Sequence, residues 1–219
     1  MIDRSDEEAT AAQPSLGHFM RLLAHELGNP VATIRMSAEM IQSTVPPEMQ
    51  AQLSTMILEE AIHLEELIAR ALFYTAMSEP ADVEADVGQI LSSVAQQFPS
   101  VAITIGSSEP LNLRCDPGQL GRMIGEAVSN AVEAGATSVT LSAREVDGNV
   151  VFLTEDNGEG MAAAAGERVF DPFYTTREGK LGLGLTIARR IAALHGGVAE
   201  AAPGNESGTT VSYRIPKNR

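Results

Sequence analysis

Apolar residues recur at steps of three and four along the first third of the chain, the spacing that gathers side chains on one face of a helix. One apolar stripe begins at Leu16, a Pro46-Pro47 pair interrupts the pattern, and a second stripe continues as far as Tyr74. The pattern predicts an antiparallel helical hairpin over residues 16–79. Its stripe residues are Leu16, Met20, Leu23, Leu27, Ile34 and Ile41, then Leu53, Ile57, Leu64, Leu67, Ala71 and Tyr74.

Two helices alone cannot bury apolar stripes of this width. The heptad-like spacing favours a homodimer, in which a second copy of the hairpin completes a four-helix bundle. The same spacing also allows the remainder of the chain to cover the stripes, and the sequence leaves that alternative open.

Beyond Pro80 the pattern changes to short alternating runs separated by amphipathic segments, which predicts an α+β domain with helices on one face of a mixed sheet. Asp116-Pro117 is a good N-cap and first-turn pair for a helix. Asp147-Gly148, between two alternating runs, is a strong hairpin signal. The expected helices cover 87–98, a segment from 117 onward and 184–194, and the expected strands cover 101–105, 111–114, 137–145, 149–155, a segment near 198 and 209–215.

These patterns divide the chain into four parts. Residues 1–15 contain too little apolar surface to fold and are expected to form a disordered tail. The hairpin follows over 16–79, a linker over 80–86, and the α+β domain over 87–216. Within the domain, the small run Ala162 to Ala165 is interpreted as a flexible loop or one weak turn.

Composition excludes several classes of protein. The 219 residues include 15 basic and 29 acidic side chains, a net charge of -14, which would repel a nucleic-acid backbone. No apolar run approaches the roughly 20 residues of a membrane helix, and the N-terminus lacks a hydrophobic signal segment. We therefore expect a soluble, cytoplasmic chain. Cys115, the single cysteine, cannot form an internal disulfide and is interpreted as a packing residue.

The first candidate for chemistry is His25 in the sequence HELGNP. It lies two positions past Leu23, so its imidazole should point away from the bundle core, where a neutral ring nitrogen can act as a nucleophile. Glu26 can hold one tautomer and accept a proton, and Asn29, one turn on, could orient a water or a phosphoryl oxygen. The alternative is ordinary helix surface, since His18 occupies the same face seven residues earlier.

The second candidate is a glycine-rich sequence after a predicted strand, DNGEG, which begins at Asp156. Gly158 and Gly160 allow the backbone to approach a flat ligand, while Asp156 presents a hydrogen-bond acceptor. Taken alone, the same five residues could be a simple turn.

Further residues of the same domain favour a polyphosphate. The sequence Gly182-Leu183-Gly184 opens a helix, which makes backbone N–H groups available to phosphates, although a packing requirement would explain the glycines equally well. Asn130 offers an oxygen to a hydrated Mg²⁺, with Glu126 one turn earlier on the same helix. The list of candidate ligands is completed by two cations of the intervening loop, Arg177 and Lys180.

The order of these motifs is more specific than any one of them. The segments HELGNPVATIRMSAEMI, GEAVSNAVEAGA, EDNGEGM, DPFYTTREGK and LGLGLTIARRIAALHGG resemble the sequence boxes of two-component sensor histidine kinases, in the order found in that family. The resemblance extends from about Leu16 to Pro216. It implies a dimerisation and histidine-phosphotransfer hairpin followed by an ATP-binding domain of the Bergerat fold, an α/β sandwich shared with gyrase and MutL.

The resemblance also implies roles for individual residues. His25 matches the phosphoacceptor, Glu26 the neighbouring acid that assists transfer, and Asn29 the polar residue associated with phosphatase activity. Asn130 matches the magnesium-binding asparagine, and Asp156 the acid that hydrogen-bonds the adenine amino group. The nucleotide-lining positions are Gly158, Gly160, Gly182, Leu183 and Gly184, and Phe173 falls in the aromatic box next to the ATP lid.

Three positions depart from the family pattern. Glu126 stands where the family commonly has Asn and where related ATPases place a water-activating Glu. Lys180 replaces the first glycine of the usual G-x-G-L-G-L box, and Gly28 stands where many members have Arg. In the ATPase interpretation, Glu126, a water and Mg²⁺ would hydrolyse ATP.

The predicted function is therefore an ATP-dependent protein-histidine kinase. It would phosphorylate His25 and pass the phosphoryl group to an Asp of a response-regulator receiver domain, with possible phosphatase activity towards that regulator. Two alternatives are a histidine phosphotransferase with a degenerate nucleotide site and the ATPase that uses Glu126. ATP and Mg²⁺ are the expected cofactors, and a second copy of the chain and a receiver domain are the expected partners.

Overall fold

The chain forms two compact units in a computed structural model that describes residues 15–106, 110–177, 179–204 and 207–217. Within these ranges, one unit comprises residues 15–77 and the other comprises residue 78 onward. The predicted tail at 1–14 lies outside the described residues. Ser15, which the sequence placed in that tail, instead caps the first helix through its hydroxyl and main-chain oxygens, which accept from His18 N.

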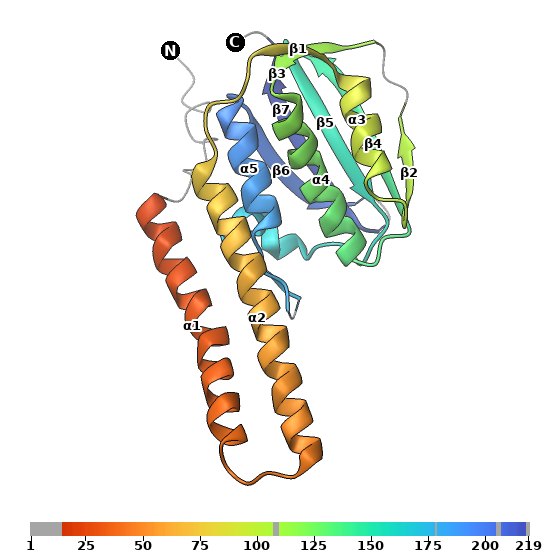
Figure 1. The fold of residues 1–219 in the computed structure, drawn as a ribbon. Coiled ribbons are helices and arrows are strands. Elements are labelled where there is room, and N and C mark those ends of the chain that lie inside the picture. The colour runs from red at the N-terminus through yellow and green to blue at the C-terminus, as the bar shows by residue number, and fades with distance from the viewer. Residues whose placement is uncertain (1–14, 107–109, 178, 205–206, 218–219) are drawn as a thin grey trace. The chain divides into compact units, whose positions relative to one another are not determined.

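The first unit is the predicted helical hairpin (Figure 1). It consists of α1 (Leu16–Ile41) and α2 (Pro47–Ala76), and the α2 start uses a proline in the first turn. The rings of Phe19 and Tyr74 stack with centroids 4.3 Å apart and tie the start of α1 to the end of α2. Such a pair adds about 0.5–1.5 kcal/mol beyond the burial of its area.

The two helices bury only part of their apolar surface against each other. Phe19, Leu53 and Leu67 are buried, whereas Leu16 and Met20, both in the predicted stripe, are 60% and 48% exposed. Further large apolar side chains of the hairpin are exposed: Val31, Met36, Met40, Met49, Met56, Leu58, Ile62, Ile68, Leu72 and Phe73.

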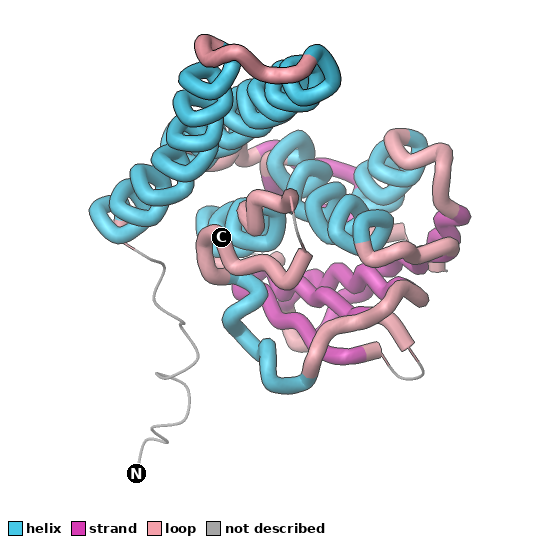
Figure 2. The backbone as a smooth tube through the Cα atoms, turned by 90° about the horizontal axis from the view of Figure 1, so that it is seen from below, coloured by secondary structure: helices cyan, strands magenta, loops and turns pink. Residues whose placement is uncertain are grey.

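The second unit is an α+β sandwich, as predicted. A five-stranded sheet in the order β2-β4-β5-β7-β6 is covered on one face by three helices, and a two-stranded sheet pairs β1 with β3 (Figure 2). The elements are β1 (Val83–Asp86), α3 (Val87–Gln96), β2 (Ala102–Ile105), β3 (Asn112–Cys115), α4 (Pro117–Glu133), β4 (Ser138–Val146), β5 (Asn149–Asp156), a 3₁₀ segment (Ala163–Phe170), α5 (Gly184–Leu194), β6 (Val198–Pro203) and β7 (Thr209–Pro216).

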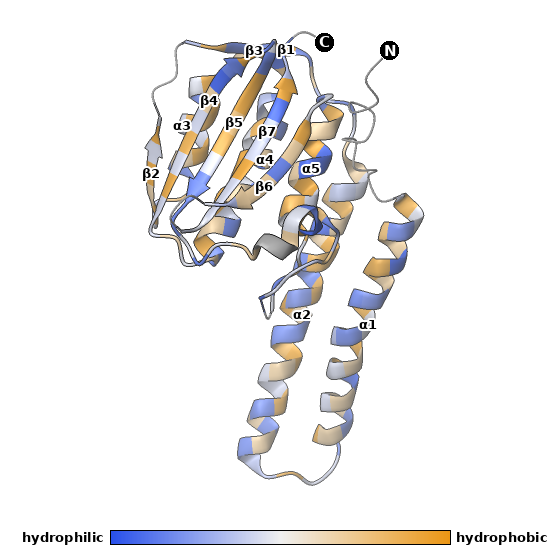
Figure 3. Ribbon diagram, turned by 180° about the vertical axis from the view of Figure 1, so that it is seen from behind, coloured by the Kyte–Doolittle hydropathy of each residue, from blue (hydrophilic) through white to orange (hydrophobic). Residues whose placement is uncertain are grey.

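The core lies between the sheet and its helices. Alternate residues of the central strands point into it, among them Leu141 of β4, Phe152 of β5 and Val211 of β7. The helices contribute buried residues to the same core, such as Leu120 of α4 and Ile187 of α5. Viewed from behind, the opposite face of the sheet carries no helix layer (Figure 3). β2 pairs in parallel with β4, and the remaining pairs are antiparallel.

One local expectation is corrected, and a second is decided between its two alternatives. Part of the predicted linker 80–86 is β1, whose Val83 pairs with Cys115 of β3. The backbone hydrogen bonds of β1 are made by β3, a strand distant in the sequence, so the four residues of β1 alone do not indicate a strand. The alanine run forms one short 3₁₀ turn from Ala163 to Ala165, as one of the two interpretations expected, and Gly166 at φ 46° and ψ -133° separates it from the rest of the segment that ends at Phe170.

Two other observations concern the whole chain. Cys115 is fully buried, as its interpretation as a packing residue requires. Among the helices of the described residues, none combines the length and hydropathy needed to cross a membrane.

Candidate functional site

The imidazole of His25 projects from α1 into solvent. Its side chain is 74% exposed, while Leu23, two positions earlier, is buried. Nδ1 of His25 lies 3.3 Å from Oε1 of Glu26. A carboxylate accepts hydrogen bonds and cannot donate them when ionised, so this contact favours the neutral tautomer with its proton on Nδ1, in which Nε2 has a free electron pair.

The backbone around this histidine departs from a regular helix. Pro30 is buried inside α1 and cannot donate a hydrogen bond to the carbonyl of Glu26. Asn29, one turn after His25, is exposed, and its carbonyl accepts from the hydroxyl of Thr33. An ideal Cβ on Gly28 would meet no atom within 4 Å, so packing within this chain does not require a glycine there.

In the second unit, α4 carries Glu126 and Asn130 one turn apart. Asp116 caps the helix by accepting from Gln119 N at 3.0 Å, with Pro117 in the first turn. Asn130 is half-buried, whereas Glu126 is only 5% exposed and forms an ion pair with Arg122 at 2.6 Å. The carboxylate of Glu126 therefore lies inside the domain with its charge compensated.

The buried carboxylate reaches two neighbouring elements. An ideal Cβ on Gly184, the first residue of α5, would lie 2.9 Å from Oε2 of Glu126, so only a glycine fits without displacing that side chain. Below it, burial raises the pKa of Tyr213 on β7, and the charge of Glu126 raises it further. Glu126 thus sits at the junction of α4, α5 and the sheet.

The loop after β5 is held against the end of α4. The Oδ1 atom of Asp156 accepts from Gly158 N at 2.8 Å, which fixes the orientation of the carboxylate. Asn157 Oδ1 accepts from the main-chain N–H groups of Thr137 and Ser138, each at 2.9 Å. An ideal Cβ on Gly158 would lie 2.8 Å from the carbonyl oxygen of Ala134. The close approach of two backbones explains this glycine.

Two other glycines complete the surroundings of Asp156. Gly160 has φ 79°, and an ideal Cβ there would lie 2.8 Å from the carbonyl oxygen of Gly208. Gly208 has φ 76° and packs against the main chain of Asp156, and a Cβ on it would lie 2.8 Å from Oδ1 of Asp156. The strand ends and the DNGEG loop therefore meet without intervening side chains.

The segment between Asp171 and α5 folds into a closed loop. The N–H of Phe173 donates to the carbonyl of Gly182 at 3.0 Å, and both residues have positive φ, 65° and 62°. Arg177 N donates to the hydroxyl of Thr175 in a tight turn. Lys180 forms an ion pair with Glu133, the last residue of α4, at 3.0 Å.

The helix that follows begins without a polar cap. Leu183 occupies the N-cap position, and its apolar side chain offers no oxygen to the first-turn N–H groups of α5. These donors, together with the positive end of the helix dipole, suit an anionic oxygen. Among the residues that the structure describes, no group of three or more His, Cys, Asp or Glu side chains could hold a metal ion by itself.

Three of the sequence-predicted residues of the second unit meet the C-terminal half of α4, which itself carries Glu126 and Asn130. Gly158 meets Ala134, Gly184 meets Glu126, and Lys180 meets Glu133. Phe173 contacts Gly182 through its main chain, and the main chain of Arg177 hydrogen-bonds the hydroxyl of Thr175 in its own turn. His25, Glu26 and Asn29 belong to the other compact unit.

Three residues of this region were not singled out by the sequence analysis. Asn157 and Gly208 hold the surroundings of Asp156, and Glu133 binds Lys180. The asparagine in DNGEG and the glycine before the last strand were available signals, since both residue types favour turns. Nothing local distinguishes Glu133 from the many other surface glutamates.

Two family models match the chain, one in each compact unit. The model described as "His Kinase A (phospho-acceptor) domain" matches residues 15–80. The model described as "Histidine kinase-, DNA gyrase B-, and HSP90-like ATPase" matches residues 115–219. The chain is 29% identical over 228 residues to the sensor histidine kinase ZraS of Klebsiella oxytoca, a match that covers 97% of this chain and 49% of that protein. The chain thus spans about half the length of the curated relatives it matches.

Solved structures show the same fold. The ATP binding domain of PrrB from Mycobacterium tuberculosis superposes with a TM-score of 0.55 and 27% identity over 64% of this chain and 99% of that one. The histidine kinase ThkA, solved in complex with the response regulator protein TrrA, gives a TM-score of 0.71 at 23% identity over 93% of this chain and 62% of that one. The second match extends the likeness in fold to both units.

Proposed function

The chain belongs to the sensor histidine kinases of two-component systems, and from that premise we propose that it is an ATP-dependent protein-histidine kinase that phosphorylates its own His25. The observation that carries the proposal is the solvent-exposed imidazole beside Glu26, in the same chain as a glycine-lined site around α4 and α5. A nucleotide site alone would leave the exposed, oriented histidine without a role.

Several features of the second unit support binding of ATP. The carboxylate of Asp156, held by Gly158 N, is an acceptor for the adenine amino group. The close backbone approaches at Gly158, Gly160 and Gly208 hold the main chain on either side of the Asp156 carboxylate in place. The uncapped first turn of α5 would bind phosphate oxygens through its N–H groups.

The same site supports a role for Mg²⁺. The ion is hard and binds oxygen, usually through few protein side chains together with substrate phosphates. Asn130 offers such an oxygen from the half-buried face of α4. Glu126, the other candidate ligand, is paired with Arg122, so we assign the ligand role to Asn130 first.

The geometry of His25 supports a definite course for the transfer. With the proton on Nδ1, the free electron pair of Nε2 attacks the terminal phosphorus of the nucleotide, and the bond from that phosphorus to the bridging oxygen breaks to release ADP. The phosphorylated ring is cationic, and its Nδ1 proton passes to Glu26, 3.3 Å away. Atoms and charge balance without a further reactant.

The phosphoryl group then requires an acceptor. We propose that it passes to an Asp of a response-regulator receiver domain, and that the exposed Asn29 orients a water for removal of the phosphoryl group from that regulator. We also propose that the exposed apolar residues of the hairpin, such as Val31 and Leu72, pack against a second copy of the chain in a four-helix bundle.

The interpretation as a hydrolase has less support. A general base must offer an unoccupied carboxylate oxygen to water, but Arg122 holds Oε1 of Glu126 at 2.6 Å and the side chain is nearly inaccessible. The degenerate phosphotransferase is disfavoured because Asn130, Asp156 and the glycines of the expected nucleotide site are all present in the sequence.

The domain limits follow from the pairing of the small sheet. Because β1 pairs with β3, we propose that the ATP-binding domain begins at Val83 and that the segment connecting it to the phosphotransfer hairpin is residues 77–82.

The kinase proposal is tested by incubation with ATP labelled on the γ-phosphate and Mg²⁺. The protein is expected to acquire acid-labile label that His25→Ala abolishes. The matched control is His18→Ala, because His18 is an exposed histidine on the same helix, and that variant should label normally. Label that persists in His25→Ala, or phosphate release that depends on Glu126 and not on His25, would contradict the proposal.

A further inference from the structure

The loop that carries Lys180 is anchored at two points. Its base is closed by the hydrogen bond from Phe173 N to the Gly182 carbonyl at 3.0 Å. Close to that base, Lys180 forms an ion pair with Glu133, and the two side chains are 46% and 30% exposed. The second anchor connects the loop to α4, an element more than 40 residues earlier in the chain.

Glu133 lies on the same face of α4 as Asn130, the residue assigned to the metal. It follows Asn130 by three positions, a spacing that makes side chains neighbours on a helix. Glu133 also ends α4, where a negative charge is unfavourable to the helix dipole, and that last turn contains no basic residue. Lys180 therefore supplies from the loop the positive charge that this end of the helix lacks.

A carboxylate and a phosphate are competing partners for one ammonium group. Both are anions, and they would repel each other if Lys180 held them at the same point. We propose that Glu133 competes with the phosphates of the nucleotide for the ammonium group of Lys180. This inference rests on the proposed nucleotide site. The pair Lys180–Glu133 opens when a polyphosphate binds, and Lys180 passes from the carboxylate to a phosphate oxygen.

The effect on affinity is modest because the ion pair is partly exposed. Removing such a competitor changes a dissociation constant by about two- to fivefold. The sign is the decisive feature, because loss of an acidic side chain next to a magnesium site would weaken binding if that side chain were a metal ligand. Competition for Lys180 predicts the opposite.

The experiment measures dissociation constants of ATP, ADP and adenosine for the whole chain by calorimetry in Mg²⁺. Glu133→Gln is expected to bind ATP about two- to fivefold more tightly than the unaltered chain, and Lys180→Gln to bind it more weakly. In the Lys180→Gln background, Glu133→Gln should have no further effect on either nucleotide. Adenosine, which has no phosphate, should bind all variants equally.

A matched control comes from a second ion pair of the same domain. Glu145, on β4, pairs with Lys217, and Glu145→Gln removes the same charge without touching the loop. This variant should leave the affinity for ATP unchanged. Thermal melting of each variant checks that it folds. Because Glu133 and Lys180 are partly exposed, we expect their substitution to leave the fold intact.

Three results would overturn the inference. Unchanged or weaker binding of ATP by Glu133→Gln excludes competition. An equal gain in the Lys180→Gln background shows that Glu133 repels phosphate without passing through Lys180. If the unaltered chain binds none of the three ligands, the proposed nucleotide site itself fails, and the inference fails with it.

Discussion

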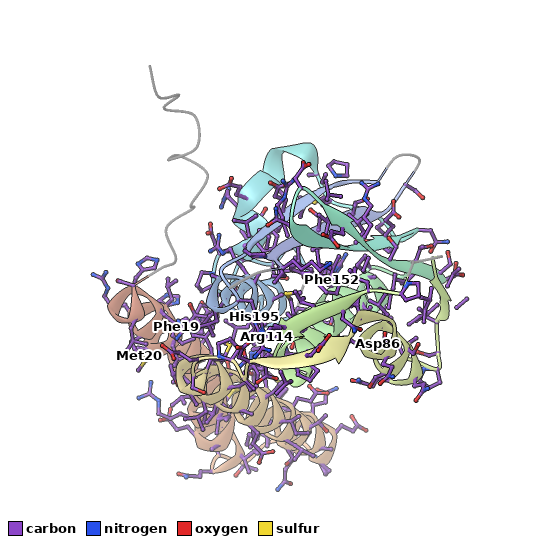
Figure 4. All side chains as sticks on the ribbon, turned by 90° about the horizontal axis from the view of Figure 1, so that it is seen from above. Phe19, Met20, Asp86, Arg114, Phe152 and His195 are labelled. Carbon is purple, nitrogen blue, oxygen red and sulfur yellow. The ribbon has the colours of Figure 1, made fainter. Side chains whose placement is uncertain are left out.

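The Nε2 atom of His195 accepts a hydrogen bond from the main-chain N–H of Asp116 at 3.2 Å, which joins the end of α5 to the start of α4. The other ring nitrogen, Nδ1, lies 2.9 Å from the carbonyl oxygen of Ile191 and donates to it. The ring is completely buried (Figure 4). This histidine fixes the spacing of the two helices that border the proposed nucleotide site.

Replacement of His195 by Phe should destabilise the second unit. The change leaves the N–H of Asp116 without its partner inside the domain, at a cost of about 1–3 kcal/mol, whereas the carbonyl of Ile191 still accepts from the main-chain N–H at position 195. Urea denaturation should show the loss as a lower midpoint. His18→Phe, an exposed change, serves as the control, and equal midpoints for the two variants would contradict the structural role.

Asn157 should be required for the loop around Asp156. Replacement by Ala removes the acceptor of two main-chain N–H groups and the donor to the Thr137 hydroxyl, all at 2.9 Å. We expect a loss of about 1–2 kcal/mol in the free energy of unfolding and weaker binding of ATP. Asn157→Asp keeps the acceptor oxygen, so it should recover most of the stability. Equal losses in the two variants would mean that the carbonyl oxygen of Asn157 is not the important atom.

Gly208→Ala is predicted to disturb the environment of Asp156. The residue has φ 76°, and the added Cβ would collide with the main chain of Asp156. We expect a loss of about 1–3 kcal/mol in stability and a strong reduction in ATP affinity, measured by chemical denaturation and calorimetry. Gly28→Ala is the opposite case. Gly28 lies inside α1, and an added Cβ would meet no atom within 4 Å, so this variant should stabilise the hairpin by about 0.5–1 kcal/mol. A neutral effect at Gly208 would mean that this backbone can move away.

Tyr213→Phe should stabilise the protein, most of all at high pH. The hydroxyl is buried and has no hydrogen-bond partner within the described residues, so its removal relieves a cost of about 1 kcal/mol or more. Burial, and then Glu126, raise the pKa of Tyr213 in the folded state. The unfolded tyrosine ionises near pH 10 while the folded one stays protonated, so folding stability falls as pH rises through 10. Thermal melts between pH 8 and 11 should show a shallower decline in the variant, and parallel declines would contradict the assignment.

The sequence predicted the elements whose signals are local. The hairpin followed from the steps of three and four, the start of α4 from Asp116-Pro117, and the turn between β4 and β5 from Asp147-Gly148, and the structure confirms all three. It missed β1, because Val83 to Asp86 become a strand only through pairing with β3, which is about 30 positions distant. The candidate site residues were likewise drawn from motifs, and their roles remain predictions.

Residue identity and spacing determined, without coordinates, that His25 would face away from the core of the hairpin and that the glycine motifs would lie at the ends of elements. Only the tertiary structure decided which groups meet: Arg122 compensates Glu126, Lys180 binds Glu133, and Gly208 packs on Asp156. The physical reason is one of range. Periodicity and caps act over a few residues, whereas the charge and close packing of a buried group depend on elements that folding brings together from distant parts of the chain.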